Sequence, residues 1–403
     1  MYNMYKIKKI VFFGIYALCY YPLTAQESIF RAYKQSFVRV DLAGKAGVLR
    51  DAALDGSAGE FMARLCGFAL DYALWNGEIM ADDADMIDLI SVAARGASAF
   101  DHTDSAETLW ELFAIYGDVL TRVEILDALR VLGRGNIRIV DDLNQFLMEQ
   151  NAVFRPDMTL EYPVIRAAVS AVGSLGNASS YPILFAMLSL DYSEEIIRTA
   201  TAGLYDIRGD FKRFLMDVIQ VNPAADAQPL STEKLIAFRL GMGSEELTEA
   251  DKGELAQAAL EVGLGDGGTD AALADLRYQS VRILTDLKWV RASETAIKHF
   301  YRVQNDYADV AATKKQFIEA VGFLGAMGST DAARVLALQL GLLNFQVEHE
   351  TTHDEDVIIA FVNALGEIGD KLAFDDLLRI RDYLDYSEKV KRAAHISLSK
   401  LKW

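Results

Sequence analysis

The stretch that decides the fold is LDYSEEIIRTATAGL at residues 190–204, because it returns near the other end of the chain. Residues 384–398 read LDYSEKVKRAAHISL and match it in register at Leu, Asp, Tyr, Ser, Glu, Arg, Ala and Leu. Self-similarity between distant segments is the sequence signature of a repeat architecture. We therefore expect further copies along the chain.

A looser version of the same helix does recur. In each copy a small residue and an apolar residue are followed by two further positions, a second apolar residue and often a glycine. The clearer copies are ALRVLG (128–133), AVGSLG (171–176), FLGAMG (323–328) and ALGEIG (364–369), and the weaker ones are GLYDIR (203–208), IAFRLG (236–241), ILTDLK (283–288) and SLSKLK (397–402). The uneven spacing of the copies argues against repeats that keep a fixed 34-residue period.

A second amphipathic segment fits between neighbouring copies, so each repeat is predicted to be a pair of helices. Neither helix can bury its apolar stripe alone, whereas stacked pairs share a continuous core. The sequence therefore predicts an all-α fold, an α-solenoid of stacked antiparallel helix pairs. The clearest second helices are expected at residues 179–190, 211–221, 331–343 and 373–384.

The phrases VIRAAVSAVGSLG (164–176) and DVIIAFVNALGEIGD (356–370) resemble HEAT repeats, in particular the HEAT-like repeats of the phycobilisome lyase type. The resemblance covers roughly residues 105–403. In that family an Asp is followed seven residues later by an Arg, and the two tie neighbouring repeats together. The resemblance implies this structural role for Asp191, Arg198, Asp385 and Arg392.

The first 25 residues have the layout of a secretory signal peptide. Lys6, Lys8 and Lys9 precede the apolar run 10–21, and a small residue, Ala25, offers the cleavage point. The apolar run is short for a bilayer span, although an uncleaved anchor stays the alternative. We expect export to the periplasm or the cell exterior of a bacterium, with no membrane span left after cleavage.

Residues 26–104 are also helical in pattern but carry no clean repeat signature. We interpret them as an N-terminal cap or as degenerate repeats, because the end of a solenoid would otherwise expose an apolar face. The repeat solenoid itself is expected at residues 105–403. Cys66 lies in the amphipathic EFMARLCGFALDYAL and is predicted to be a buried small apolar residue, not a nucleophile.

The charge of the chain restricts its partners. Its formal net charge is −18, from 40 Lys and Arg against 58 Asp and Glu. Such a surface repels phosphate backbones, so nucleic-acid binding is not expected. It is compatible with a basic protein or peptide partner.

The stretch His349-Glu350-Thr351-Thr352-His353 spells the zinc-peptidase motif His-Glu-x-x-His. On one helix both histidines would face a metal ion, and Glu350 would activate a water. A zinc-dependent hydrolase that uses His349, Glu350 and His353 is therefore one hypothesis. Incidental metal binding by an acidic, His-containing loop is another.

The repeat register argues against the zinc hypothesis. Equivalent leucines of four copies each stand eleven residues after a residue that favours the helix N-cap. These N-cap residues are Ser193, Thr313, Asp354 and Ser387. A helix that starts after Asp354 leaves His353 outside it. We expect the preceding helix to end near residues 343–344, so that both histidines lie in a connector.

The function predicted from the sequence is a non-enzymatic interaction scaffold without a cofactor, which binds a protein or peptide on the concave face of the solenoid. A related alternative is an accessory subunit of an envelope complex, in which the scaffold would bind permanently within that one complex. No aromatic ladder or basic stripe marks the concave face. Its exposed candidates for partner binding are Thr199, Asp206, Lys315, Glu319, Asn363 and Glu367.

Overall fold

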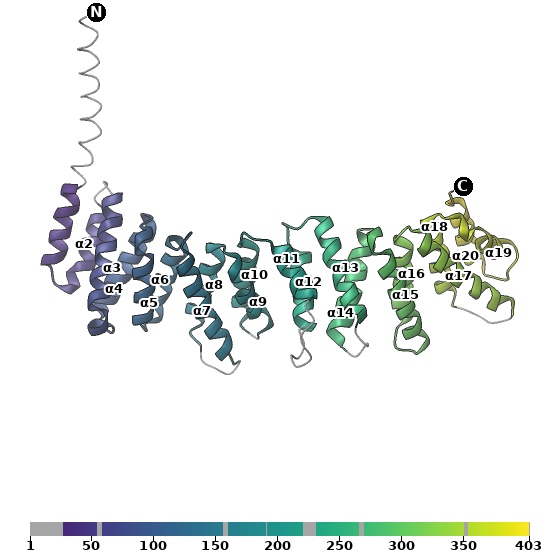
Figure 1. The fold of residues 1–403 in the computed structure, drawn as a ribbon, viewed down its shortest axis with the longest axis horizontal. Coiled ribbons are helices and arrows are strands. Elements are labelled where there is room, and N and C mark those ends of the chain that lie inside the picture. Colours follow the sequence, from purple (N-terminus) through teal and green to yellow (C-terminus); the bar gives the residue numbers. More distant parts are fainter. Residues whose placement is uncertain are drawn as a thin grey trace, which may run out of the picture. The chain divides into compact units, whose positions relative to one another are not determined.

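The computed structural model shows only helices among the residues that it describes, which confirms the prediction of an all-α, solenoid-like fold (Figure 1). None of these helices combines the length and the apolar character that a membrane crossing requires. The described residues are 27–54, 59–155, 160–190, 192–220, 231–265, 270–349 and 354–402. The predicted signal peptide at residues 1–25 lies outside them.

The chain divides into an N-terminal unit, Met1–Asp210, and a C-terminal unit, Phe211–Trp403. The N-terminal unit consists of a helix at 27–39, α2 (Leu42–Leu54), α3 (Glu60–Met80), α4 (Ala84–Ala99), η1 (Thr103–Ser105), α5 (Ala106–Ile115), α6 (Val119–Leu132), α7 (Ile137–Val153), α8 (Tyr162–Leu175), η2 (Ala178–Ser180), α9 (Tyr181–Ser189) and α10 (Glu194–Asp206).

The C-terminal unit consists of α11 (Phe211–Gln220), α12 (Ser231–Gly243), α13 (Glu249–Gly265), α14 (Ala271–Asp286), η3 (Val290–Ala292), α15 (Ser293–Ala308), α16 (Lys314–Ala326), α17 (Thr330–Glu348), α18 (Glu355–Ile368), η4 (Lys371–Ala373), α19 (Phe374–Asp382) and α20 (Glu388–Ser399). Each η element is a short 3-10 turn that leads into the helix after it.

Each unit is built of two layers of helices. In the N-terminal unit, α2, α4, α6, α8 and α10 contact one another in that order, while α3, α5, α7 and α9 form the second row. In the C-terminal unit, α12, α14, α16, α18 and α20 form one row, and α11, α13, α15, α17 and α19 form the other. We call these the even layer and the odd layer. All copies of the repeat phrase lie in the even layer.

The helices of the even layer begin where the repeat register predicts. Asp354 accepts a hydrogen bond from the Asp356 amide at the start of α18. Thr313 starts α16 with a reciprocal capping box, in which its side chain and that of Gln316 each bond to the other's backbone. Ser193 and Ser387 also stand at N-cap positions, but neither side chain makes a capping bond.

Glycines end several of these helices because the last turn needs a left-handed residue. Gly176, Gly328 and Gly369 have φ angles of 67°, 62° and 72°. In the copy at residues 283–288 the corresponding residue is Lys288, whose φ of 47° places a bulky side chain in the same conformation. A non-glycine residue there costs about 1 to 2 kcal/mol.

Small residues let neighbouring even helices approach closely, since the third residue of one copy meets the first residue of the next. A Cβ added to Gly173 would lie 2.6 Å from the Cα of Gly203, and one on Gly366 would lie 2.7 Å from the Cβ of Ser397. One on Gly325 would lie 2.9 Å from the Cα of Ala364. No larger side chain fits these three junctions without moving the helices apart.

The end of α17 differs from the sequence prediction. The expected stop near residues 343–344 is wrong, because α17 continues to Glu348. Nothing between Asn344 and His349 is a glycine or proline that would interrupt it. The connector before α18 is correspondingly shorter.

In the segment at residues 26–104, helices α3 and α4 contact α5 and α6 in the same two-layer arrangement as the rest of the unit. Cys66 is fully buried, and its burial raises the thiol pKa to about 12. A Cβ on Gly96 of the neighbouring helix α4 would lie 2.4 Å from its Sγ. The prediction of a buried cysteine is confirmed.

Candidate functional site

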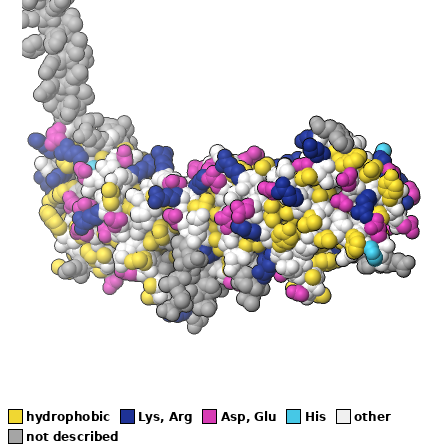
Figure 2. All heavy atoms as spheres, turned by 45° about the vertical axis from the view of Figure 1, so that its right-hand side comes forward, with side chains coloured by type: hydrophobic (Ala, Val, Ile, Leu, Met, Phe, Trp, Pro, Cys, Tyr) yellow, Lys and Arg dark blue, Asp and Glu magenta, His cyan; other side chains and the backbone are white. Residues whose placement is uncertain are grey.

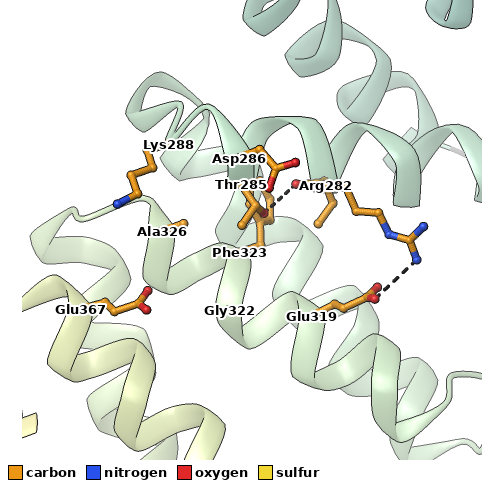
Figure 3. Close-up of a pocket in the computed structure, with 10 residues that line it drawn as sticks. Arg282, Thr285, Asp286, Lys288, Glu319, Gly322, Phe323, Ala326 and Glu367 are labelled. Carbon is orange, nitrogen blue, oxygen red and sulfur yellow. Dashed lines mark hydrogen bonds and ion pairs between the residues drawn. The ribbon is translucent and has the colours of Figure 1, made fainter. Parts of the chain in front are cut away.

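A groove of about 510 Å³ opens between α14 and α16 on the even layer of the C-terminal unit (Figure 3). Its floor is mainly apolar, and charged side chains stand around its rim. The lining residues are Val281, Arg282, Thr285, Asp286 and Lys288 from α14 and its end, Glu319, Gly322, Phe323 and Ala326 from α16, and Glu367 from α18.

This junction lacks the small residues of the closed ones. By register, Thr285 stands where Gly173, Gly325 and Gly366 stand in their copies, and Phe323 stands where Ala364 stands. The phenyl ring of Phe323 is fully buried and fills the space into which a neighbouring helix would otherwise pack. The two helices are held apart at their surface, and a hollow remains between them.

Gly322 forms an open part of the groove floor. A Cβ added at this position would meet no atom within 4 Å, although the residue lies in the interior of α16. Helical glycine costs roughly 0.5 to 1 kcal/mol relative to alanine. Packing in the described structure therefore gives no reason for a glycine at this position.

The rim carries five charged groups. Arg282 and Glu319 form an ion pair of 3.4 Å across one end of the groove. Figure 3 shows Lys288 and Glu367 together at the opposite end of the groove. The side chains of Asp286, Lys288 and Glu367 are exposed, and the structure records no ion pair for any of the three among the residues that it describes.

The pair of Arg282 and Glu319 belongs to a series of ion pairs that join adjacent helices of the even layer. In most of them a cation of one helix reaches a carboxylate on the next helix or its N-cap. The series, called the charge ladder below, comprises Arg50–Asp88, Arg95–Glu124, Arg122–Glu161 and Arg166–Glu195 in the N-terminal unit, and Arg239–Asp275, Arg282–Glu319, Lys314–Asp354 and Lys389–Asp356 in the C-terminal unit.

The charge ladder leaves the even layer nearly neutral in an acidic chain. Exposed pairs of this kind contribute only about 0 to 1 kcal/mol each. Their main effect is to match positive and negative groups across each junction. Interspersed Lys and Arg and Asp and Glu side chains are visible on the face drawn in Figure 2.

A buried histidine supports the groove from behind. His299 of α15 is fully buried, with its ring 6.0 Å from that of Phe323 and 6.1 Å from that of Tyr278. Neither ring nitrogen has a hydrogen-bond partner among the described residues. Burial, together with the nearby positive charge of Arg277, lowers the pKa of His299 to about 3. The ring is therefore neutral and acts as part of the core.

The predicted surface residues are only partly brought together. Glu319 and Glu367 both line the groove. Lys315 and Asn363 are exposed on the same even layer, on α16 and α18. Thr199 and Asp206 lie on α10 of the N-terminal unit, where the hydroxyl of Thr199 donates to the carbonyl of Glu195.

The residues given a structural role by resemblance show no ion pair in the described part of the chain. Asp385 and Arg392 are exposed, and the structure records no contact between their charged groups. Arg198 is exposed in the same way, and Asp191 lies outside the described residues. Cross-repeat ion pairs are made by other residues, in the charge ladder and also in the odd layer, where Lys212 of α11 reaches Asp251 and Glu254 of α13.

Of the zinc motif at residues 349–353, the structure describes only the first residue, His349. His349 caps the end of α17, where its ring Nδ1 lies 2.8 Å from the Phe345 carbonyl oxygen. Glu350 and His353 lie outside the described residues. Among the described residues, no group of three or more His, Cys, Asp or Glu side chains is placed to hold a metal ion.

Sequence reasoning missed most of the groove, namely Val281, Arg282, Thr285, Asp286, Lys288, Gly322, Phe323 and Ala326. The available signal was in the repeat phrase itself. The copies ILTDLK and FLGAMG carry Thr285 and Phe323 at positions where other copies carry Gly or Ala. Comparison with known proteins adds no further identification: no family model matches the chain, and no curated protein matches it.

Proposed function

We propose that this chain is a non-enzymatic, HEAT-like scaffold that is exported across a bacterial inner membrane and binds a protein or peptide partner on its even layer. The α14–α16 groove is the observation that carries the proposal. Its volume of about 510 Å³ is in the range of sites that enclose a ligand group, roughly 300 to 1,000 Å³. An apolar floor inside a polar rim is also the arrangement of interface hot spots.

The mechanism follows from the two-layer architecture. Within each unit, packed helix pairs present the exposed side chains of the even layer in a fixed arrangement, so a partner is met by a preformed surface. The charge ladder contributes matched charges and little net attraction. The groove contributes a concave contact, in which a partner side chain leaves water against Gly322 and Ala326, above the buried ring of Phe323.

The test fills the groove without disturbing the core. Gly322→Leu places a side chain into the open space over α16, where nothing lies within 4 Å of its Cβ. Gly47→Leu is the matched control, because Gly47 is also an interior helical glycine with nothing within 4 Å, on α2 of the other unit. Both variants are expected to fold as the parent does, as checked by circular dichroism and thermal unfolding.

The three purified proteins are then used to capture partners from an envelope fraction of the native cells. The affinity of each captured protein for the parent and for both variants is then measured by titration. We expect a partner that binds the parent and the Gly47→Leu protein equally and binds Gly322→Leu at least tenfold more weakly. A partner that binds all three proteins equally would contradict a role of the groove. Failure to capture any partner would contradict the scaffold function.

A further inference from the structure

We propose that the α14–α16 groove selects a partner segment in which a positively charged side chain stands close to an apolar one. This inference rests on the scaffold function and specifies the chemistry of the partner. Its apolar part fits the floor over Gly322, Phe323 and Ala326. Its cation is received by the carboxylates of Asp286 and Glu367 at the rim.

The positions of these two carboxylates are unfavourable in the free protein. Asp286 is the last residue of α14, and Glu367 lies one residue before the end of α18. The C-terminal end of a helix carries partial negative charge, so acids there are destabilising by about 0.3 to 1 kcal/mol. A bound cation would interact favourably with either carboxylate and with the helix end beside it.

Within the even layer of the C-terminal unit, the two acids are exceptions. In helices α12 to α20 of this layer, every other carboxylate either joins the charge ladder or lies in the first turn of its helix, where the dipole favours an acid. The ladder includes Asp275, Glu319 and Asp356, and the first turns hold Glu233, Glu355 and Glu388. Only Asp286 and Glu367 have neither arrangement, and both line the groove.

Lys288 does not remove this excess of negative charge. Its ammonium group lines the same groove but forms no ion pair with a described carboxylate. A lysine just beyond the end of α14 is already favoured by the helix dipole, so its position needs no ligand. With Arg282 and Glu319 paired, the remaining rim groups are two carboxylates and one ammonium. Both this local balance and the net charge of −18 favour a cationic partner.

The experiment measures binding of the full chain to an array of twelve-residue peptides of three classes: basic with apolar residues, acidic with apolar residues, and uncharged with apolar residues. The decisive variant is Asp286→Asn with Glu367→Gln. Asp51→Asn is its matched control, because Asp51 lies in the last turn of α2 and is also exposed on an even layer. Lys288→Gln tests the opposite charge, and Gly322→Leu tests the groove itself.

We expect the basic class to bind best at low salt and to lose binding with Gly322→Leu. The double substitution should weaken that binding about fivefold to tenfold, and Lys288→Gln should strengthen it about twofold to threefold. Asp51→Asn should leave it unchanged, and added salt should weaken it.

Two results would overturn the inference in different ways. If acidic or uncharged peptides bind best, are blocked by Gly322→Leu and ignore the double substitution, the cation is not selected although the scaffold function stands. If no class shows binding that Gly322→Leu removes, the groove is not a peptide site, and its proposed function fails with the inference.

Discussion

Two junctions on either side of α16 differ in how closely their helices pack. Toward α18, Gly325 meets Ala364 so closely that an added Cβ would lie 2.9 Å from a backbone atom. Toward α14, Gly322 faces open space, and Phe323 and Thr285 occupy the positions of small residues. One helix thus forms a closed junction toward α18 and an open one toward α14.

The difference shows that a solenoid makes a binding groove by a local change of side-chain size. The backbone of α16 is an ordinary helix at both positions. Close packing of two helices requires small residues where their axes approach, and a larger residue there separates them.

The largest expected effect separates the two faces of α16 directly. Gly325→Leu should lower the free energy of unfolding by about 3 kcal/mol, because the new side chain overlaps the backbone of α18. Gly322→Leu should change it by less than about 1 kcal/mol, with a gain from helix propensity. Urea unfolding of both variants measures the contrast. Equal destabilisation would mean that the α14–α16 junction is closed as well.

A smaller effect concerns His299, whose buried ring makes the stability of the protein depend on pH. Because the pKa of His299 is about 3 in the folded protein and 6.5 is its ordinary value, only the unfolded chain takes up the proton as pH falls below about 6.5. Linkage then removes about 2 kcal/mol of stability between pH 7 and pH 5. His299→Leu should abolish that part of the pH dependence, as urea unfolding at both pH values would show. An unchanged pH dependence would argue against a buried neutral ring.

The smallest effect tests the strained end of α14. Lys288→Gly replaces a side chain held at a φ of 47° by the residue that other copies use. We expect a gain of about 1 kcal/mol in unfolding free energy, measured by thermal unfolding. Gly328→Lys is the reciprocal variant at the end of α16 and should lose a similar amount. A loss of stability in Lys288→Gly would mean that the lysine stabilises this end more than its strain costs.

Much of the fold is predictable from the sequence because each repeat carries the apolar periodicity and the helix-start residue of its own helix pair. Apolar periodicity gives the helix pairs, and the register of the repeat gives helix starts such as Thr313 and Asp354. Helix ends are less certain where no residue interrupts the helix. The stretch from Phe345 to Glu348 contains no glycine or proline, so α17 runs past the expected stop.

The groove is harder to predict for a physical reason. The sequence shows that Phe323 and Thr285 depart from the repeat phrase, but it does not show that the first and third positions of adjacent copies meet. That pairing depends on how the helices pack in three dimensions. Glu319 and Glu367 are predicted as exposed residues of one surface, yet the hollow between them depends on side chains counted as core.

The row arrangement of the even layer also determines how the protein opens. Each helix of a row contacts its immediate neighbours, so stability is set junction by junction. The most loosely packed junction should have the lowest free energy of local opening, and its amides should exchange with solvent first. Around the α14–α16 groove, a partner can therefore be admitted or released by a local fluctuation that leaves the closed junctions of α16 with α18 and α18 with α20 intact.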